Sequence, residues 1–252
     1  MKQDLFFSGT SGLVVPVAKS LFPPGFENKS RLQYYASLYN SIEINSSFYK
    51  TPLVTTVKRW AEEVPENFKF TFKLSRNITH NKGLVFDSAE LISFMQTLSH
   101  VGDKKGCLLI QFPPGLHADH FNQFEKLLTQ IRQADDKKEW QLAVEFRNKS
   151  WYIGEVYEEL KYHYATMVIH DIPASATPSN IDTADFVYIR FHGPGGRYRG
   201  SYPDEFLQDM ARQISCWRNA GKAVYFYFNN TMGDALKNLN SLNACLSAAI
   251  TN

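Results

Sequence analysis

Side chains that can carry protons recur along this chain at the ends of short β-rich segments. Glu43 and Glu145 are carboxylates, and His192 has an imidazole that titrates near neutral pH. Lys73 could serve as a base, or as an amine that forms a Schiff base, if neighbouring cations lower its pKa. We take these four residues as the candidate catalytic groups of a hydrolase, a lyase or an isomerase.

A second set of residues is suited to binding a ligand. Arginine holds carboxylate or phosphate groups, and side-chain amides hold hydroxyl groups. The candidate binding residues are Asn45, His80, Gln111, Arg147, Asp171, Arg190, Arg197 and Asn229. The glycine-rich stretch 192–200, which contains Arg197, lies where TIM barrels often bind phosphate. We therefore predict a small polar substrate that bears phosphate or carboxylate groups.

Eight β-rich segments must position these residues. They span residues 5–8, 41–45, 68–74, 106–111, 141–145, 166–169, 186–192 and 223–229. Segments of helical period lie between most of them, which predicts an α/β fold, a TIM (β/α)8 barrel, formed as a single domain by residues 1–252. Residues 171–185 are the exception, because Pro173 and Pro178 disfavour a helix there. We expect a loop in place of the helix between the sixth and seventh strands.

Alternation within each strand predicts which side chains point into the barrel. Phe68, Phe70 and Phe72 suit the face beneath the helices, which leaves Thr71 and Lys73 inside. The same rule places inside the barrel Glu43, Asn45, Gln111, Glu145, Arg147, Asp171, Tyr188, Arg190, His192, Tyr225, Tyr227 and Asn229. The most polar of these stand at the carboxyl ends of the strands, where barrel enzymes build their active sites.

Other interpretations of this polar ring stay open. The acids Glu43, Glu145 and Asp171 face as many bases, so the groups could pair with one another and merely close the barrel. A ring that is fully paired, with no open cavity, would indicate a non-catalytic ligand-binding module. A glycosidase pair of Glu43 and Glu145 is disfavoured, because the neighbouring bases hold both carboxylates ionised.

No cofactor is predicted and no metal ligand is assigned, but a divalent metal is an alternative. Side chains of ligand type lie in or near the ring at Glu43, His80, Glu145, His170, Asp171 and His192. A metal-dependent phosphodiesterase or nucleic-acid-processing barrel would contact phosphates and stack on bases at the rim through Arg76, Trp151, Arg197, Tyr198 and Arg199. This alternative is less favoured, because the bases of the ring would compete with a metal ion.

Composition narrows the classes of protein further. The 27 Lys and Arg residues nearly balance the 25 Asp and Glu residues and form no basic run, which disfavours a dedicated nucleic-acid binder. No apolar stretch reaches the ~20 residues that a membrane-spanning helix needs. Cys107, Cys216 and Cys245 are too scattered for a disulfide framework or a zinc site. We expect a cytoplasmic protein that acts on a small molecule, and the sequence leaves its oligomeric state open.

Sequence blocks along nearly the whole chain resemble one known family. They read SGTSG at residues 8–12, SIEINSSFY at 41–49, FTFK at 70–73, ITH at 78–80, QFPP at 111–114, VEFR at 144–147 with SW at 150–151, RFHG at 190–193 and YFNN at 227–230. This order of blocks is similar to that of the YecE-like family, a bacterial and archaeal family whose domain is of unknown function. The resemblance implies a TIM barrel whose motif residues coincide with the inward polar ring, and it implies no substrate.

One position departs from the family pattern. Relatives usually carry Trp or Tyr after the first block, where this chain has Leu13. The aromatic side chain expected in the wall of the pocket is therefore missing, or is replaced by Phe22.

Overall fold

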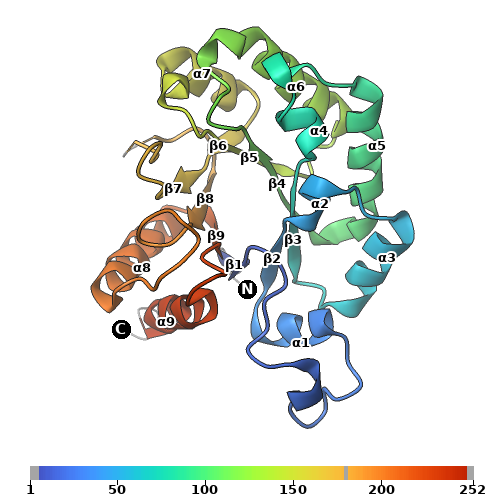
Figure 1. Cartoon of the computed structure of the whole chain (residues 1–252), viewed down its shortest axis with the longest axis vertical. Helices are drawn as coiled ribbons and strands as arrows, with labels where there is room; N and C mark the ends of the chain where they lie inside the picture. Colours follow the sequence, from blue (N-terminus) through green and yellow to red (C-terminus); the bar gives the residue numbers. More distant parts are fainter. Residues whose placement is uncertain (1–5, 179–180, 249–252) are drawn as a thin grey trace.

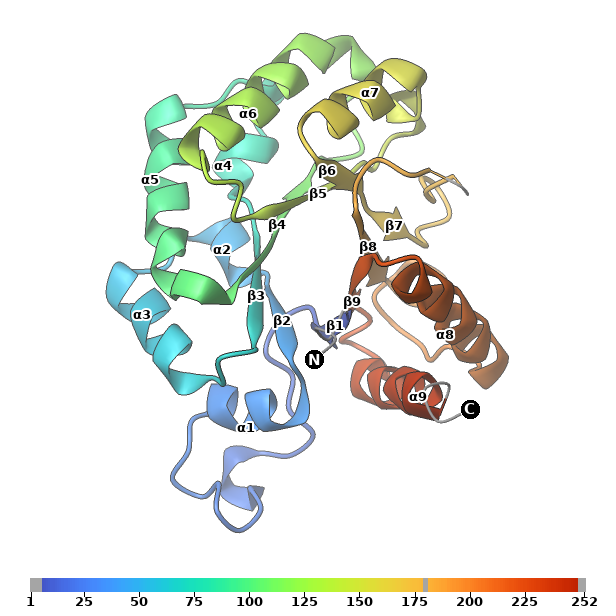
Figure 2. The same cartoon turned by 180° about the vertical axis from the view of Figure 1, so that it is seen from behind.

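In the computed structural model, which describes residues 6–178 and 181–248, parallel strands alternate with helices (Figures 1 and 2). The strands are β1 (Phe6–Thr10), β2 (Ser41–Ile44), β3 (Lys69–Lys73), β4 (Lys105–Gln111), β5 (Gln141–Glu145), β6 (Ala165–Met167), β7 (Ile169–His170), β8 (Phe186–Phe191) and β9 (Ala223–Phe228). The α-helices are α1 (Arg31–Leu38), α2 (Ser46–Tyr49), α3 (Val54–Glu63), α4 (Arg76–Thr79), α5 (Ser88–Leu98), α6 (Phe121–Ala134), α7 (Gly154–Tyr162), α8 (Asp204–Asn219) and α9 (Ala235–Ala248). Short 3-10 turns lie at Lys19–Leu21, Lys82–Leu84, Ser99–Lys104, Ala118–His120 and Lys149–Trp151. None of the helices in the described residues is long and apolar enough to cross a membrane.

The strands form two parallel sheets that together make a barrel. Their order is β1-β9-β8-β7 in one sheet and β2-β3-β4-β5-β6 in the other. At the first seam, Ser11 forms an isolated parallel bridge with Glu43, and the amide of Gly12 donates to the carbonyl oxygen of Glu43 at 2.7 Å. At the second seam, β6 and β7 are consecutive pieces of one segment that leaves β5 and joins β8. The predicted TIM-barrel fold is confirmed, although the strand ladder of the described residues is not hydrogen-bonded continuously around the ring.

The strands occur where the alternation predicts them, although most of their ends differ from the prediction by one or two residues. The first strand continues to Thr10, two residues beyond its predicted end at Ser8, while Leu5 lies outside the described residues. The predicted sixth strand divides at Val168, where the segment changes partner. β2 ends one residue early, because Asn45 already has a right-handed helical backbone (φ −77°, ψ −20°) and precedes α2. Strand parity therefore does not extend to Asn45.

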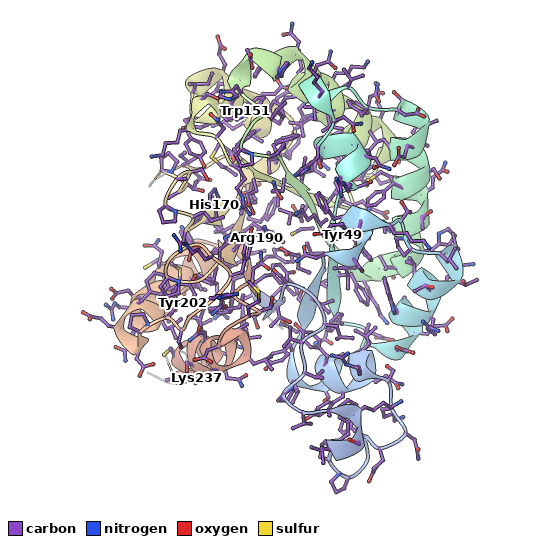
Figure 3. All side chains as sticks on the ribbon, in the orientation of Figure 1. Tyr49, Trp151, His170, Arg190, Tyr202 and Lys237 are labelled. Carbon is purple, nitrogen blue, oxygen red and sulfur yellow. The ribbon has the colours of Figure 1, made fainter. Side chains whose placement is uncertain are left out.

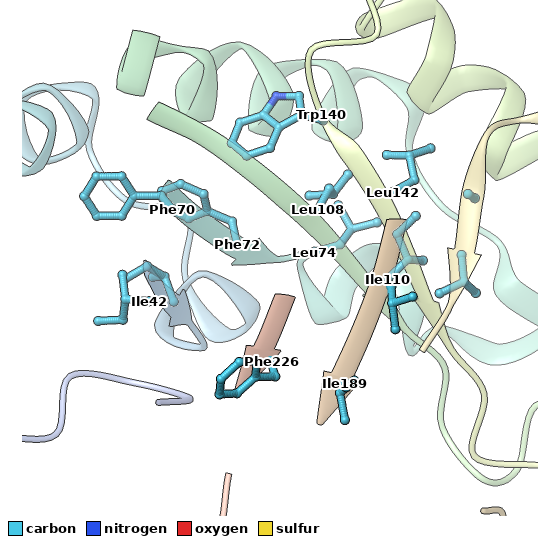
Figure 4. Packing of buried hydrophobic residues seen from close by; sticks show 14 of the residues in the cluster. Ile42, Phe70, Phe72, Leu74, Leu108, Ile110, Trp140, Leu142, Ile189 and Phe226 are labelled. Atoms are coloured by element: carbon cyan, nitrogen blue, oxygen red, sulfur yellow. The ribbon is translucent and has the colours of Figure 1, made fainter. Parts of the chain in front are cut away.

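Buried apolar side chains lie on both faces of the strands. Outside the barrel, Ile42, Phe70 and Phe72 belong to the large core beneath the helices (Figure 4). Inside the barrel, a smaller cluster comprises Cys107, Leu109, Ala143, Val168, Phe186, Tyr188, Tyr225 and Tyr227. The hydroxyl of Tyr227 bonds with the hydroxyls of Ser41 and Thr71 at 2.6 and 2.8 Å, which confirms that Thr71 points inward. Much of the aromatic content is therefore structural, and the polar ring lies above this inner cluster.

The predicted loop between the sixth and seventh strands is confirmed for the part that the structure describes. Residues 171–178 and 181–185 contain no helix. The outer side of β8 beside α8, which a helix would otherwise cover, borders a cavity of about 470 Å³. Apolar side chains of its wall include Met167, Ile169, Ile181, Val187 and Trp217. The loop itself contributes Ile181, so it covers this face of the sheet only in part.

Candidate functional site

One guanidinium and two carboxylates form an ion network inside the barrel. Arg190 of β8, labelled near the middle of the barrel in Figure 3, has 1% of its side chain exposed, and Glu43 of β2 and Glu145 of β5 are fully buried beside it. Its Nε and Nη2 donate to the carboxylate of Glu43 at 2.9 and 2.7 Å, and its Nη1 donates to Glu145 at 2.7 Å. Every nitrogen of the guanidinium has a protein partner. The geometry therefore favours a structural role for Arg190 over the predicted role in binding an anion.

Both carboxylates of this network are held ionised. Glu43 also accepts hydrogen bonds from Ser11 Oγ at 2.6 Å and from Tyr188 Oη at 2.5 Å. Burial by itself would raise the pKa of Glu43, but the charge of Arg190 and these hydrogen bonds outweigh burial and lower the pKa. For Glu145 too, burial is outweighed by nearby arginines, and the pKa lies well below its usual value. Neither residue supplies the protonated acid that a glycosidase needs at neutral pH.

His192, which directly follows β8, is a buried neutral imidazole in one tautomer. Its Nε2 lies 3.0 Å from Nη2 of Arg147 and 3.2 Å from Nη1 of Arg190. Because guanidinium nitrogens only donate, Nε2 must accept, and the proton lies on Nδ1, 3.3 Å from Oδ1 of Asp171. Burial is the largest cause that lowers the pKa of His192, to about 4. His192 is therefore uncharged near neutral pH and has no imidazolium form that could act as a general acid.

Asp171 fixes the start of the loop that follows β8. Its Oδ1 accepts a hydrogen bond from the amide of His192 at 2.8 Å, and its Oδ2 accepts one from the hydroxyl of Tyr202. The same hydroxyl accepts from the amide of Gly193 at 2.6 Å. Although burial would raise the pKa of Asp171, these hydrogen bonds lower it. Asp171 therefore orients His192 and the loop.

Lys73, the last residue of β3, has an amine bound to neutral partners. Its Nζ donates to Oε1 of Gln111 at 2.7 Å and lies 3.9 Å from the centre of the Phe48 ring. Nε2 of Gln111 donates to the carbonyl oxygen of Phe112 at 2.7 Å, which turns the amide oxygen toward the lysine. In the described residues, no carboxylate lies within 4.0 Å of Nζ. Burial and the charge of Arg190 lower the pKa of Lys73 to about 8.

Arg147 lies between the ion network and the open end of the barrel. Its Nε donates to Glu145, its Nη2 bonds to His192 at 3.0 Å, and its Nη1 lies 3.4 Å from the hydroxyl of Tyr198. Its side chain is 10% exposed, against 1% for Arg190. Of these two arginines, Arg147 is therefore the one positioned to meet a ligand.

His80 shares the ring of Phe48 with Lys73. The His80 and Phe48 rings meet edge to face, with their centroids 4.8 Å apart, and Nδ1 of His80 lies 2.9 Å from the hydroxyl of Thr79. Burial and the charge of Lys73 lower the pKa of His80 to about 4. His80 is consequently neutral at pH 7. We name the group formed by Phe48, Lys73, His80, Gln111 and Arg147 the mouth cluster.

Comparison with known proteins assigns the chain to a family. Residues 7–252 match the family model described as "Protein of unknown function DUF72". The chain belongs to the DUF72 family. The resemblance to the YecE-like proteins is confirmed, because relatives that match this chain carry that name.

Two curated relatives and two solved structures illustrate the relationship. UPF0759 protein YunF of Bacillus subtilis (strain 168) is 28% identical over 250 residues, which cover 87% of each chain. UPF0759 protein YecE of Escherichia coli (strain K12) is 29% identical over 82 residues, 32% of this chain and 30% of that protein. A DUF72 structure from Enterococcus faecalis V583 superposes with a TM-score of 0.78 at 20% identity, covering 96% and 95% of the two chains. One from Thermotoga maritima MSB8 gives 0.75 at 24% identity, covering 98% and 99%. These similarities show the DUF72 fold, and none of the names states a substrate.

The side chains of three predicted binding residues form no hydrogen bond with the mouth cluster or the ion network in the described residues of this DUF72 protein. Asn45 borders a cavity of about 260 Å³ with the outward-facing Ile42 and Ile44, and its buried Oδ1 has no hydrogen-bond partner in the described residues. Asn229 follows β9, and Arg197 is exposed on the loop after β8. Neither of these two side chains forms a hydrogen bond within the part of the chain that the structure describes. Their roles in binding stay predictions.

The same cavity locates Leu13, the position that departs from the family pattern. Leu13 lines the cavity, and Trp60 of α3 supplies its aromatic wall. Phe22 instead packs on Tyr34, with ring centroids 4.4 Å apart. Phe22 is not among the residues that line this cavity, so the structure does not support the alternative in which Phe22 replaces the missing aromatic residue.

The structure also corrects which aromatic residues are open to a ligand at the rim. Trp151, which is labelled in Figure 3, is fully buried. Its Nε1 donates to the carbonyl oxygen of Leu116 at 2.8 Å, and its ring stacks on Phe146. It cannot stack on a nucleic-acid base. Tyr198 is 36% exposed, and its ring meets His192 edge to face. Of the two aromatic residues predicted to stack on nucleic-acid bases, only Tyr198 is therefore exposed enough to do so.

Sequence reasoning missed three residues that shape the site. Ser11 and Phe48 lie inside the blocks that resemble the family, so those blocks carried a signal for them. Tyr202 carried none, because it belongs to neither a strand nor a block. Its contact with Asp171 depends on how the loop after β8 folds back.

Residues 6–178 and 181–248 provide no set of ligands for the metal site of the alternative interpretation. This part of the chain holds no group of three or more His, Cys, Asp or Glu side chains that could hold a metal ion. Glu43 and Glu145 face arginines instead. His170 bonds through Nε2 to the carbonyl oxygen of Phe146 at 3.0 Å and accepts on Nδ1 from the amide of Ile172 at 3.3 Å, which is a structural arrangement.

Proposed function

We propose that this DUF72 protein is an enzyme that binds a small polar substrate, bearing a phosphate or carboxylate group, at the carboxyl end of its barrel. The supporting observation is the amine of Lys73, which rests on a neutral amide and an aromatic ring while the nearby carboxylates are occupied by arginines. An anion that enters here meets a cation that it need not remove from an ion pair. Charge-assisted hydrogen bonds of this kind are about twice as strong as neutral ones.

The mouth cluster and the buried ion network have different roles in this proposal. Arg147 and the protonated form of Lys73 hold the anion, and the neutral form of Lys73 serves as the base or the nucleophile. Gln111 and His80 contact the rest of the substrate, as do the predicted binding residues Asn229 and Arg197. The buried network supports the mouth cluster by fixing Arg147 through Glu145 and His192. We expect no cofactor and no membrane partner, and the reaction is that of a lyase, an isomerase or a hydrolase.

Thermal unfolding with anions tests this proposal. Inorganic phosphate and acetate, compared with chloride at equal ionic strength, should raise the Tm of the unmodified protein, because a ligand that binds only the folded state stabilises it. Lys73→Met and Arg147→Met should each raise the phosphate concentration that gives half of the Tm increase by about tenfold or more. Lys69→Met is the matched control: Lys69 lies at the other end of β3, with its Nζ on the carbonyl oxygen of Asp103 at 2.7 Å, so the phosphate response should be unchanged.

The proposal fails if phosphate and acetate stabilise the protein no more than chloride does. It also fails if Lys69→Met loses as much of the phosphate-dependent increase in Tm as Lys73→Met and Arg147→Met do. A titration with double-stranded DNA at low salt covers the nucleic-acid alternative, and tight binding that disappears at high salt would favour a nucleic-acid substrate instead.

A further inference from the structure

The amine of Lys73 has a side-chain amide oxygen and an aromatic ring as its partners, a combination that no other lysine in the described residues shows. Some lysine amines donate to backbone carbonyl oxygens, as Lys69 does, and others pair with carboxylates, for example Lys105 with Glu139 at 3.0 Å and Lys161 with Glu158 at 2.8 Å. An amine in such a pair loses its partner's attraction when it gives up its proton. Lys73 donates to an amide oxygen and lies over a ring, so losing its proton breaks no direct ion pair.

We propose that Lys73 forms an imine with a small aldehyde or ketone that also carries a carboxylate or phosphate group. This inference rests on the proposed function, because it names the substrate class of the same mouth cluster. The carbonyl carbon bonds to Nζ of Lys73, and Arg147, the more exposed of the two arginines, holds the anionic group.

The reaction balances without a cofactor. The lone pair of Nζ bonds to the carbonyl carbon, the π electrons of the C=O bond move to oxygen, and a proton passes from nitrogen to that oxygen. The resulting carbinolamine takes up one proton from solvent and loses its hydroxyl group as water while the nitrogen lone pair forms the C=N bond. Carbonyl compound, neutral amine and one proton thus give a protonated imine and water. The imine then accepts electrons from an adjacent C–C or C–H bond, which is the chemistry of a lyase or an isomerase.

The surroundings of Nζ suit each form of the nitrogen. A protonated imine keeps one N–H group, and the oriented oxygen of Gln111 can continue to accept it. It also keeps its positive charge, which the face of Phe48 attracts. The amide of Gln111 takes no proton itself, so it holds the amine in place without competing for the proton that the reaction moves.

Charged groups from several elements set how much neutral amine is present. Burial, Arg190 of β8 and Arg147 after β5 lower the pKa of Lys73, whereas Glu145 of β5 and Glu43 of β2 raise it, and the balance is a pKa of about 8. His80, after α4, is neutral. About a tenth of the amine is then uncharged at pH 7, against less than about a thousandth for an ordinary lysine.

Borohydride trapping tests the imine. The full-length protein is incubated at pH 7 with pyruvate, glyoxylate or glyceraldehyde 3-phosphate, reduced with sodium borohydride, and analysed by intact mass and peptide mapping. We expect a stable adduct on Lys73 with these anionic carbonyl compounds, and about tenfold less adduct with acetone, which has no anionic group. Lys73→Arg keeps the positive charge and should give no adduct at this position. The control Lys69→Arg should react at Lys73 as the unmodified protein does.

Two results would overturn the imine. One is the absence of any adduct on Lys73 with all of the anionic probes. The other is labelling of Lys73 no faster than that of Lys69, since this would indicate unselective reaction with lysines. Phosphate-dependent Tm measurements on the same samples separate the two proposals. Phosphate stabilisation without an adduct overturns the imine and leaves the proposed function standing, whereas the absence of both overturns both.

Discussion

The buried ion network and the mouth cluster each hold a cation inside the same barrel, but they hold its charge differently. In the network, Arg190 is shared between two carboxylates and has almost no exposed surface. In the mouth cluster, Lys73 rests on an amide oxygen and an aromatic ring. Both positions belong to the inward polar ring that strand parity predicts. The partner of each charge, rather than its residue type, therefore separates the structural cation from the cation that we propose to be reactive.

The largest expected effect is the loss of the network cation. Arg190→Met leaves the buried carboxylate of Glu43 without a counter-charge and leaves Glu145 with Arg147 alone, so the free energy of unfolding should fall by about 3–5 kcal/mol. Lys73→Met removes a cation of the mouth cluster that has no close carboxylate, and should cost less than about 1 kcal/mol. Urea denaturation of both variants measures the two losses. Similar losses would mean that the network and the mouth cluster do not differ as described.

The buried histidine of the network makes stability depend on pH. His192 has a pKa of about 4 in the folded protein, against about 6.5 in an unfolded chain. Between these values the unfolded chain binds more protons, so the free energy of unfolding should fall as the pH is lowered from about 6.5 to about 4, by on the order of 3 kcal/mol. Urea denaturation at pH 7 and pH 5 should show a smaller loss for His192→Gln than for the unmodified protein. An identical loss in both would contradict the neutral, buried His192.

Gln111→Glu should make the mouth cluster resemble the network. The substitution places a carboxylate beside Nζ of Lys73, where the amide oxygen lies at 2.7 Å, and an opposite charge raises the pKa of a lysine. Each unit of increase lowers the neutral amine about tenfold, so borohydride trapping at pH 7 should slow by about that factor and recover at higher pH. Gln111→Met removes the acceptor without adding a charge and serves as the control. If trapping by Gln111→Glu keeps the rate and pH profile of the unmodified protein, the neutral partner of Lys73 has no influence.

The smallest expected effect lies at the outer edge of the mouth cluster. Tyr198→Phe removes a hydroxyl that lies 3.4 Å from Nη1 of Arg147, near the limit of a hydrogen bond. The free energy of unfolding should stay within about 0.5 kcal/mol of its original value. The phosphate concentration that gives half of the Tm increase should change by about twofold. A tenfold change would extend the mouth cluster to Tyr198.

Local periodicity explains how much of the fold and the site could be predicted. Side chains alternate faces along a strand whatever the strand pairs with, so residues such as Lys73 and Glu145 could be assigned to the barrel interior and to one end of it. The missing helix followed from prolines, whose effect is also local. Asn45 was misplaced, because β2 ends one residue earlier than its pattern indicates and a helix begins there. Trp151 was expected at the rim, but its burial depends on Leu116 and Phe146, which no local pattern connects to it.

The sequence by itself determined the alternation of strands and helices, the faces of the strands and the end of the barrel at which polar groups collect, since each depends on neighbours a few residues away. The tertiary structure decided which of these charges are neutralised. Arg190 and Glu43 are 147 positions apart in the chain, and Arg190 and Glu145 are 45 apart. Such pairs meet only when the barrel forms. Charges interact strongly in the low dielectric of the barrel interior. The ion-pair partner of a charged side chain, and not its residue type, therefore determines whether its charge is structural or available for chemistry.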